Sequence, residues 1–208
     1  MNKFLLVAAI TLVIVFFVLS ISRKMIYGKL VGYLENGDFE SFYKNVDKPI
    51  NKLMISKVDL SYFKLKAAFI EQNKKKVIHY LDEIEPLLFS DKQKGKIYMD
   101  AFNYFIGIQD KHNAKEYLTR INEIGDPRQK IETNRVYNIY IKKSDEDLKD
   151  LLDECEDLME ENRAVNEYLI SLIYKNKNDK ENQKKYEELS KKHMAILDET
   201  IRQSKIKK

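Results

Sequence analysis

The sequence predicts an all-α protein in which one N-terminal transmembrane helix is followed by an α-solenoid of about five antiparallel helix hairpins. Three observations lead to this prediction. An uncharged apolar run lies near the start, the rest of the chain is rich in charged residues and poor in glycine and proline, and a polar break recurs at nearly regular intervals.

The apolar run Phe4–Ile21 reads FLLVAAITLVIVFFVLSI and contains eighteen residues without a charge. As a helix it spans roughly 27 Å, close to the ~30 Å hydrocarbon thickness of a bilayer. A secretory signal usually has a shorter apolar region and a small-residue cleavage site, whereas the nearest candidate here is the weak Val18-Leu19-Ser20. The run therefore favours an uncleaved anchor in residues 1–25 that contacts the lipid bilayer, and a cleaved signal is the alternative.

The charges that flank the anchor bear on its orientation. Lys3 precedes the apolar run, and Arg23, Lys24 and Lys29 follow it. The positive-inside rule places the more basic flank in the cytoplasm. We therefore expect a single-pass protein of the cell membrane whose body lies, by a small margin, on the cytoplasmic side.

The composition of the remaining chain is typical of a helical, water-soluble body. Charged residues make up 34% of the 208-residue sequence, there are six glycines and three prolines, and tryptophan is absent. The abundance of Lys, Asn, Ile and Tyr suggests an AT-rich genome such as that of a low-GC bacterium. The single cysteine, Cys155, excludes an internal disulfide, and it lies on an apolar helical stripe where a thiol behaves as a small hydrophobe.

Five polar breaks divide the body, and each is followed by a helical pattern with a conspicuous apolar position. The aligned positions are separated by 38, 37, 34 and 35 residues, and they are Phe42, Tyr80, Tyr117, Leu151 and Tyr186. A period of this length is typical of stacked helix hairpins. Apolar spacing of three and four residues then predicts helices over residues 2–35, 38–47, 56–72, 74–88, 92–109, 112–123, 128–142, 145–159, 161–176 and 179–203.

Local signals mark several of the predicted helix ends. Gly37 suits the left-handed conformation that ends a helix, and Asp38 suits the N-cap of the next one. Asp126 followed by a proline predicts another N-terminus. Ser144 with an acidic residue three positions later resembles a capping box. Pro86 lies inside a helical pattern, so we expect a kink or an early helix end there.

The body resembles the tetratricopeptide-repeat (TPR) family of ~34-residue helix-turn-helix units. The resemblance depends on the period, on the turns NGDFESFY and HNAKEYL, and on the small-then-aromatic pair Ala114 and Tyr117. It covers residues 26–190 and leaves residues 191–208 as a basic C-terminal helix end. It implies a non-catalytic scaffold that binds a peptide or another protein on its concave face.

The motifs of common enzyme classes are missing from the sequence. The six glycines form no phosphate-binding loop. His79, His112 and His193 have no metal-ligand spacing with another His, Cys or carboxylate. We therefore predict no catalytic, cofactor-binding or metal-binding residue, no cofactor and no enzymatic activity.

Two segments carry strong charge. Residues 145–161 contain ten acids against Lys149, which indicates a solvated helix face or, alternatively, a docking surface for a basic partner. The segment from Lys175 contains eleven Lys or Arg against six acids. It is interpreted as a solubilising end helix, with docking on the acidic segment, contact with anionic lipid, or weak nucleic-acid attraction as alternatives. No specific nucleic acid is expected.

Polar residues on the first helix of a hairpin, away from the apolar stripe, are the candidates for peptide binding. Their side chains are suited to hydrogen-bonding an extended backbone or a terminal carboxylate. They are Asn103, Asn134, Arg135, Asn138 and Asn166.

The predicted function is that of a membrane-anchored scaffold that recruits other proteins, with an unknown protein or peptide partner. One alternative is a sensor that binds a peptide or lipid and transmits its occupancy through the anchor. Another is an enzyme built from residues scattered over several hairpins.

Overall fold

The protein is all-α in the computed structural model, which describes the backbone of residues 3–206 and the side chains of residues 10–160 and 162–203. The predicted anchor starts at residue 1 and the predicted tail ends at residue 208, so both extend beyond the described backbone. The side chains of residues 4–9, within the predicted anchor, also lie outside the described ranges. No strand occurs among the described residues. The helices are α1 (Lys3–Glu35), α2 (Phe39–Val46), α3 (Pro49–Met54), α4 (Lys57–Ile70), α5 (Lys74–Ile84), η1 (Glu85–Leu87), α6 (Asp91–Gly107), α7 (Lys111–Ile124), α8 (Pro127–Tyr137), η2 (Asn138–Lys142), α9 (Leu148–Asp157), α10 (Glu160–Asn176) and α11 (Lys180–Ile206).

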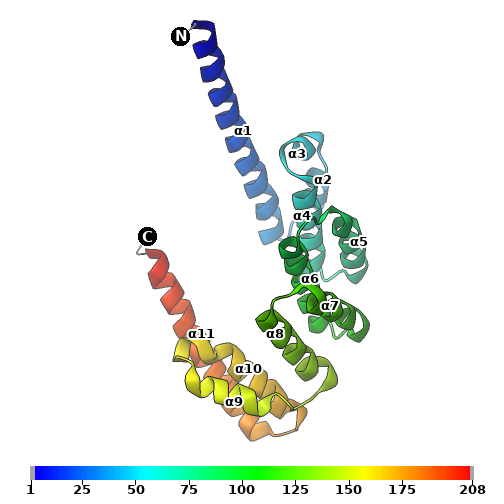
Figure 1. The fold of residues 1–208 in the computed structure, drawn as a ribbon, viewed down its shortest axis with the longest axis vertical. Coiled ribbons are helices and arrows are strands. Elements are labelled where there is room, and N and C mark those ends of the chain that lie inside the picture. The colour runs from blue at the N-terminus through cyan, green and yellow to red at the C-terminus, as the bar shows by residue number, and fades with distance from the viewer. Residues whose placement is uncertain (1–2, 207–208) are drawn as a thin grey trace. The chain divides into compact units, whose positions relative to one another are not determined.

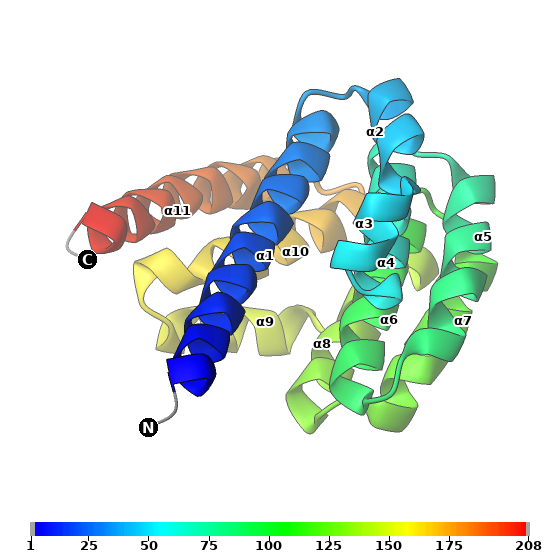
Figure 2. The ribbon, with the colours of Figure 1, turned by 90° about the horizontal axis from the view of Figure 1, so that it is seen from above.

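The chain forms two compact units, unit 1 (Met1–Lys94) and unit 2 (Gly95–Lys208). The core of unit 1 is built on the second half of α1, where Leu30 and Leu34 pack with Phe42 and Val46 of α2. The core of unit 2 includes a cluster from η2, α9 and α10, formed by Ile139, Leu151, Leu169, Ile170 and Ile173. In unit 2, α10 and α11 run side by side (Figures 1 and 2).

The first half of α1 has a different environment from the second. Its described apolar side chains are exposed, with Phe16 75% and Leu12 70% accessible. The segment Ile10–Glu35 has a mean hydropathy of 1.9 over its most apolar window and is long and apolar enough to cross a membrane. A secretory signal near an N-terminus has the same properties. In Figure 1 this half of α1 extends past the small helices of unit 1.

A left-handed residue ends the first helix of every hairpin. These residues have φ between 52° and 68° and are separated by 35, 37, 34 and 35 residues: Gly37, Gln72, Gln109, Lys143 and Asn178. The predicted role of Gly37 is confirmed. The five hairpins are α1/α2, α4/α5, α6/α7, α8-η2/α9 and α10/α11. The stacking of all five into one solenoid stays a prediction.

Four of the five turns have the same hydrogen bonds. The N-cap residue after the turn donates its N–H to the carbonyl five residues earlier, at 2.8–3.1 Å, and its side chain accepts from the N–H three residues later, at 3.0–3.3 Å. These N-caps are Asp38, Asn73, Asp110 and Asp179. This combines a Schellman helix end with an N-cap, so each turn satisfies backbone groups of both helices.

The fifth turn, between η2 and α9, differs from the others. The helix widens into a π turn over Asn138–Lys142, and Ser144 N–H therefore donates to the carbonyl of Asn138, six residues earlier. The capping box predicted at Ser144 is wrong, because its Oγ accepts from Glu146 N–H at 3.2 Å and the helix begins only at Leu148. Asp147 is the N-cap, and its side chain makes no capping hydrogen bond.

Other predicted helix ends are partly confirmed. Asp126 caps α8 by accepting from Gln129 N–H at 2.9 Å, as expected. The early end at Pro86 is confirmed, since α5 stops at Ile84 and η1 is a 3₁₀ turn. The sequence prediction missed α3, which begins with Pro49 and contains six residues.

Candidate functional site

Unit 2 contains a groove of about 1070 Å³ between α6, α8, α9 and α10, which we call the unit 2 groove. The groove is open to solvent, as the exposure of two apolar residues at its edge indicates: Ile131 is 61% exposed and Val165 is 58% exposed. Its lining combines apolar, amide and charged side chains: Met99, Phe102, Asn103, Arg128, Ile131, Glu132, Thr133, Arg135, Val136, Glu154, Asp157, Leu158, Asn162, Val165, Asn166 and Leu169.

Helical spacing explains why these residues share one surface. Residues three and four positions apart lie on the same face of a helix. The face of α8 that lines the groove therefore carries Arg128, Glu132 and Arg135, and that of α9 carries Glu154 and Asp157. On α10 the same spacing brings two amides and two apolar residues to the groove: Asn162, Val165, Asn166 and Leu169.

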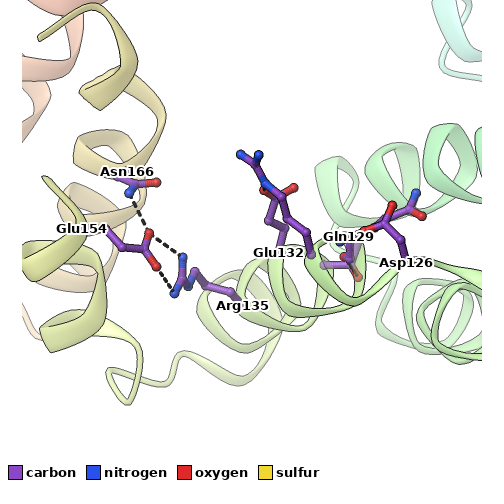
Figure 3. A network of polar contacts seen from close by, with 8 residues as sticks. Asp126, Gln129, Glu132, Arg135, Glu154 and Asn166 are labelled. Atoms are coloured by element: carbon purple, nitrogen blue, oxygen red, sulfur yellow. Dashed lines mark hydrogen bonds and ion pairs between the residues drawn. The ribbon is translucent and has the colours of Figure 1, made fainter. Parts of the chain in front are cut away.

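A charged hydrogen-bond network joins the three helices (Figure 3). Arg135 donates from Nη1 and Nη2 to the two oxygens of Glu154, at 3.0 and 2.8 Å. Asn166 Nδ2 donates to Glu154 Oε2 at 2.9 Å. Arg135 Nε lies 3.6 Å from Asp147 Oδ1. Because Arg135 is only 8% exposed, its guanidinium is held in a fixed position within the wall of the groove.

The network shifts the ionisation of both partners toward the charged forms. The hydrogen bonds from Arg135 lower the pKa of Glu154, and they outweigh the opposing effect of its partial burial. Burial lowers the pKa of Arg135, but the hydrogen bonds and charge of Glu154 raise it by more. At neutral pH the pair is therefore a fully ionised contact between α8 and α9.

The remaining charges give the groove a negative balance. Arg128 Nε donates to Glu132 Oε1 at 2.8 Å, so both guanidiniums of the lining are bound to carboxylates. Asp157, at the end of α9, is exposed and adds a third carboxylate to the lining. With two guanidiniums and three carboxylates, the lining favours a ligand with positive rather than negative charge.

Three of the five predicted binding residues line this groove: Asn103, Arg135 and Asn166. The other two do not. Asn134 donates from Nδ2 to Asn122 Oδ1 at 2.9 Å and to the Lys130 carbonyl at 2.8 Å, so it joins α7 to α8. Asn138 begins the π turn, where its carbonyl accepts from Lys143 and Ser144.

Sequence reasoning did not single out several of the lining residues. Arg128 and Asn162 are not named among the sequence-based candidates, and Asp157 is included there only as part of the acidic run 145–161. The signal that identifies them is their spacing from residues already chosen, since Arg128 precedes Arg135 by seven residues and Asn162 precedes Asn166 by four. Both intervals are close to whole helical turns.

The histidines and the cysteine lie outside the groove. His193 of α11 is buried, and its Nδ1 lies 2.8 Å from Glu167 Oε2 of α10. His79 and His112 are exposed. Burial is the main cause that raises the pKa of Cys155 to about 11, which makes its thiolate scarce at neutral pH. Among the described residues, no group of three His, Cys, Asp or Glu side chains is arranged to hold a metal ion.

Comparisons of the chain with protein-family models, with curated protein sequences and with solved structures find no match.

Proposed function

We propose that the chain is a membrane-anchored, TPR-like scaffold whose unit 2 groove binds a peptide segment of a partner protein. The observation that supports this proposal is the groove itself, in which amide, apolar and charged side chains from four helices converge. Three residues chosen from the sequence as peptide-binding candidates are among its lining. The proposal includes no reaction catalysed by the chain.

The chemistry of the lining specifies the kind of peptide. Ile131 and Val165, which are 61% and 58% exposed, offer apolar contact for side chains of the ligand, as does the partly buried Val136. Asn103 and Asn162 are exposed amides suited to hydrogen-bonding an extended backbone. The excess of carboxylates favours lysine or arginine in the ligand and disfavours a terminal carboxylate. We therefore propose a ligand with apolar and basic side chains, which agrees with the acidic character of α9.

The anchoring part of the proposal depends on α1. Its first half carries exposed apolar side chains that water would not favour, and its length and hydropathy suit a membrane span. The basic residues that follow the apolar run favour a cytoplasmic body. We propose that α1 remains attached to the mature protein and holds both units at the membrane surface.

A second candidate function is a sensor that transmits ligand occupancy through α1. It is favoured by the continuity of α1, which runs without a break from the exposed apolar half to Leu30 and Leu34 in the core of unit 1. A movement of that core would therefore act directly on the apolar half. A ligand that changes the accessibility of Phe16 in the membrane-bound chain would favour this candidate over a passive scaffold.

The groove can be tested by selecting ligands from a random twelve-residue peptide library on the full-length chain held in lipid nanodiscs. We expect the selected peptides to be enriched in Lys or Arg and in Leu, Ile or Phe, and to lose most of their binding to an Asp157→Lys variant. Asp153→Lys is the matched control, because Asp153 is an exposed acid of the same helix that does not line the groove. Equal loss in both variants, or no enrichment over empty nanodiscs, would contradict the proposal.

A further inference from the structure

The short helix α3 of unit 1 is fixed against α1 directly beyond the apolar run. Arg23 Nε donates to the carbonyl of Met54, the last residue of α3, at 2.8 Å. Arg23 follows Ile21 by two residues, which corresponds to about 3 Å along a helix. Tyr27 of α1 packs edge to face against Phe63 of α4, with ring centroids 5.2 Å apart. These contacts set the height of α3 along α1.

Two sides of α3 have opposite environments. Asn51 and Met54 are 6% and 7% exposed, and Asn51 Nδ2 donates to the Asn45 carbonyl at 2.8 Å, so this side faces the body of unit 1. Ile50 and Leu53, three residues apart on the other side, are 55% and 79% exposed. A helix of six residues thus presents two large aliphatic side chains to its surroundings.

Basic side chains surround this apolar pair. Lys48, Lys52 and Lys57 are exposed on the same segment, and Arg23 and Lys24 are exposed on α1. The segment also contains two acids, both engaged within the chain. Asp47 lies 3.2 Å from Lys52 Nζ and 3.1 Å from Lys64 Nζ, and Asp59 accepts from Ser56 Oγ at 2.7 Å. The surface around Ile50 and Leu53 is therefore positively charged overall.

The position of α3 distinguishes a membrane from other occupants of this surface. Within unit 1, α3 lies beside α1 at the end of the unit nearest the N-terminal half of α1 (Figure 1). If Phe4–Ile21 spans the hydrocarbon layer, a level about 3 Å beyond it falls in the headgroup region, which is several Å thick on each side of a bilayer. Exposed aliphatic residues framed by lysines are the pattern of a segment that lies in this interface.

We propose that α3 is a second membrane contact, in which Ile50 and Leu53 insert at the boundary of the acyl chains and the surrounding lysines and arginine bind the phosphates of anionic lipids. This inference rests on the proposed anchoring by α1. Together the two contacts orient unit 1 with respect to the bilayer, because one point of attachment allows rotation and two do not.

The absence of tryptophan from the sequence permits a direct test with single-tryptophan variants of the full-length chain. Leu53→Trp reports on α3. Ile70→Trp is the matched control, because Ile70 is 53% exposed and lies at the other end of α4, about 20 Å from Lys57. Phe16→Trp reports on the proposed span. Each variant is placed in nanodiscs that contain brominated lipids, which quench tryptophan on contact.

With anionic nanodiscs of phosphatidylglycerol, we expect emission from Leu53→Trp to be blue-shifted and quenched at least about twofold more than emission from Ile70→Trp. Neutral phosphatidylcholine, or replacement of Lys48, Lys52 and Lys57 by glutamate, should reduce this quenching. Quenching of Leu53→Trp no greater than that of Ile70→Trp, with Phe16→Trp quenched, would overturn the α3 proposal and leave the anchor intact.

Two further outcomes would also overturn the inference. A blue shift of Leu53→Trp without quenching, dependent on protein concentration, would assign the surface to a second copy of the chain. Absence of quenching in Phe16→Trp would remove the anchor itself, and the α3 contact with it. The peptide selection on the unit 2 groove has a separate readout, so failure of either proposal is distinguishable from failure of the other.

Discussion

Two kinds of hairpin turn occur among the described residues, and the irregular kind belongs to the hairpin that lines the candidate site. Four turns repeat one hydrogen-bond pattern, with a left-handed residue followed by an Asp or Asn cap. The fifth, between η2 and α9, has a π turn and lacks a side-chain cap. The unit 2 groove is lined by α8 and α9 of this irregular hairpin. π turns inside helices are frequently found at functional sites.

The irregular hairpin is held by contacts between helices instead of by its turn. Arg135 joins α8 to α9 through Glu154. Lys177 pairs with Asp145, and Asn176 Nδ2 donates to the carbonyl of Ile139 at 3.0 Å. A regular turn is stabilised locally by its own residues, whereas this one depends on neighbours in unit 2. Amide hydrogen exchange of the detergent-solubilised full-length chain tests that distinction, because it resolves individual hairpins.

The largest effect is expected from Leu151→Ala, because Leu151 is fully buried in the cluster between η2, α9 and α10. Removal of a buried leucine side chain costs about 2–5 kcal/mol. Exchange protection should fall in α8, α9 and α10 and remain unchanged in α4 and α5. Leu53→Ala, at a position 79% exposed, is the control and should change protection little. Loss of protection in both units alike would mean that the hairpins are not independent.

A smaller loss is expected from Arg135→Ala, which leaves Glu154 without its main partner. We expect about 1–3 kcal/mol, less than the roughly 3–5 kcal/mol for a fully buried ion pair, because the Glu154 side chain is 44% exposed. Arg128→Ala is the control, since Arg128 and Glu132 form a solvent-exposed pair four residues apart, and such pairs contribute little to stability because water and salt screen them. Equal losses in the two variants would show that the Arg135 network does not hold the irregular hairpin.

The pH dependence of the same hairpin follows from the lowered pKa of Glu154. Its unfolded pKa is about 4.3, so the stabilisation is fully present above that pH and is lost as the pH falls through the lower folded pKa. Protection of α8 and α9 in the unsubstituted chain should therefore decrease between about pH 4 and the acid limit. The Arg135→Ala variant should show a flatter dependence, and an unchanged slope would assign the acid sensitivity to other carboxylates.

The smallest effects on stability are expected from substitutions within the turns, which compare a regular turn with the irregular one. Asp110 accepts from Asn113 N–H in a regular turn, and Asp110→Ala should cost about 1 kcal/mol in the α6/α7 hairpin. Ser144→Ala in the irregular turn should cost only a few tenths of a kcal/mol, because its hydroxyl accepts from Glu146 N–H outside any helix. If Ser144→Ala costs as much stability as Asp110→Ala, the expectation that Ser144 contributes little to this turn is wrong.

The regular part of the fold was predictable because its signals are local. Gly37 with Asp38, and Asp126 before a proline, each determine a helix end within a few residues. The helix α3 was missed because six residues are too few to display apolar periodicity, and Pro49 at its first position is the only signal. The π turn was missed because it depends on how η2 packs against α9 and α10, which no short window contains.

The candidate site was predictable only in part. Asn103, Arg135 and Asn166 line the groove, and the sequence indicates them because they are polar residues on the first helix of a hairpin. Asn134 does not line the groove, because it precedes Arg135 by one residue and therefore lies about 100° away around the helix. The groove itself arises from the packing of four helices. Its shape and the excess of carboxylates in its lining could therefore be recognised only from the structure.

The continuity of α1 affects how a partner protein would encounter unit 1. A helix from Ser22 to Glu35 extends about 21 Å, and no flexible linker separates the apolar half of α1 from the core of unit 1. In the membrane-anchored chain that we propose, unit 1 would diffuse in two dimensions at a fixed standoff from the bilayer. Partners attached to the same membrane would then meet it at a raised effective concentration and in a restricted range of orientations.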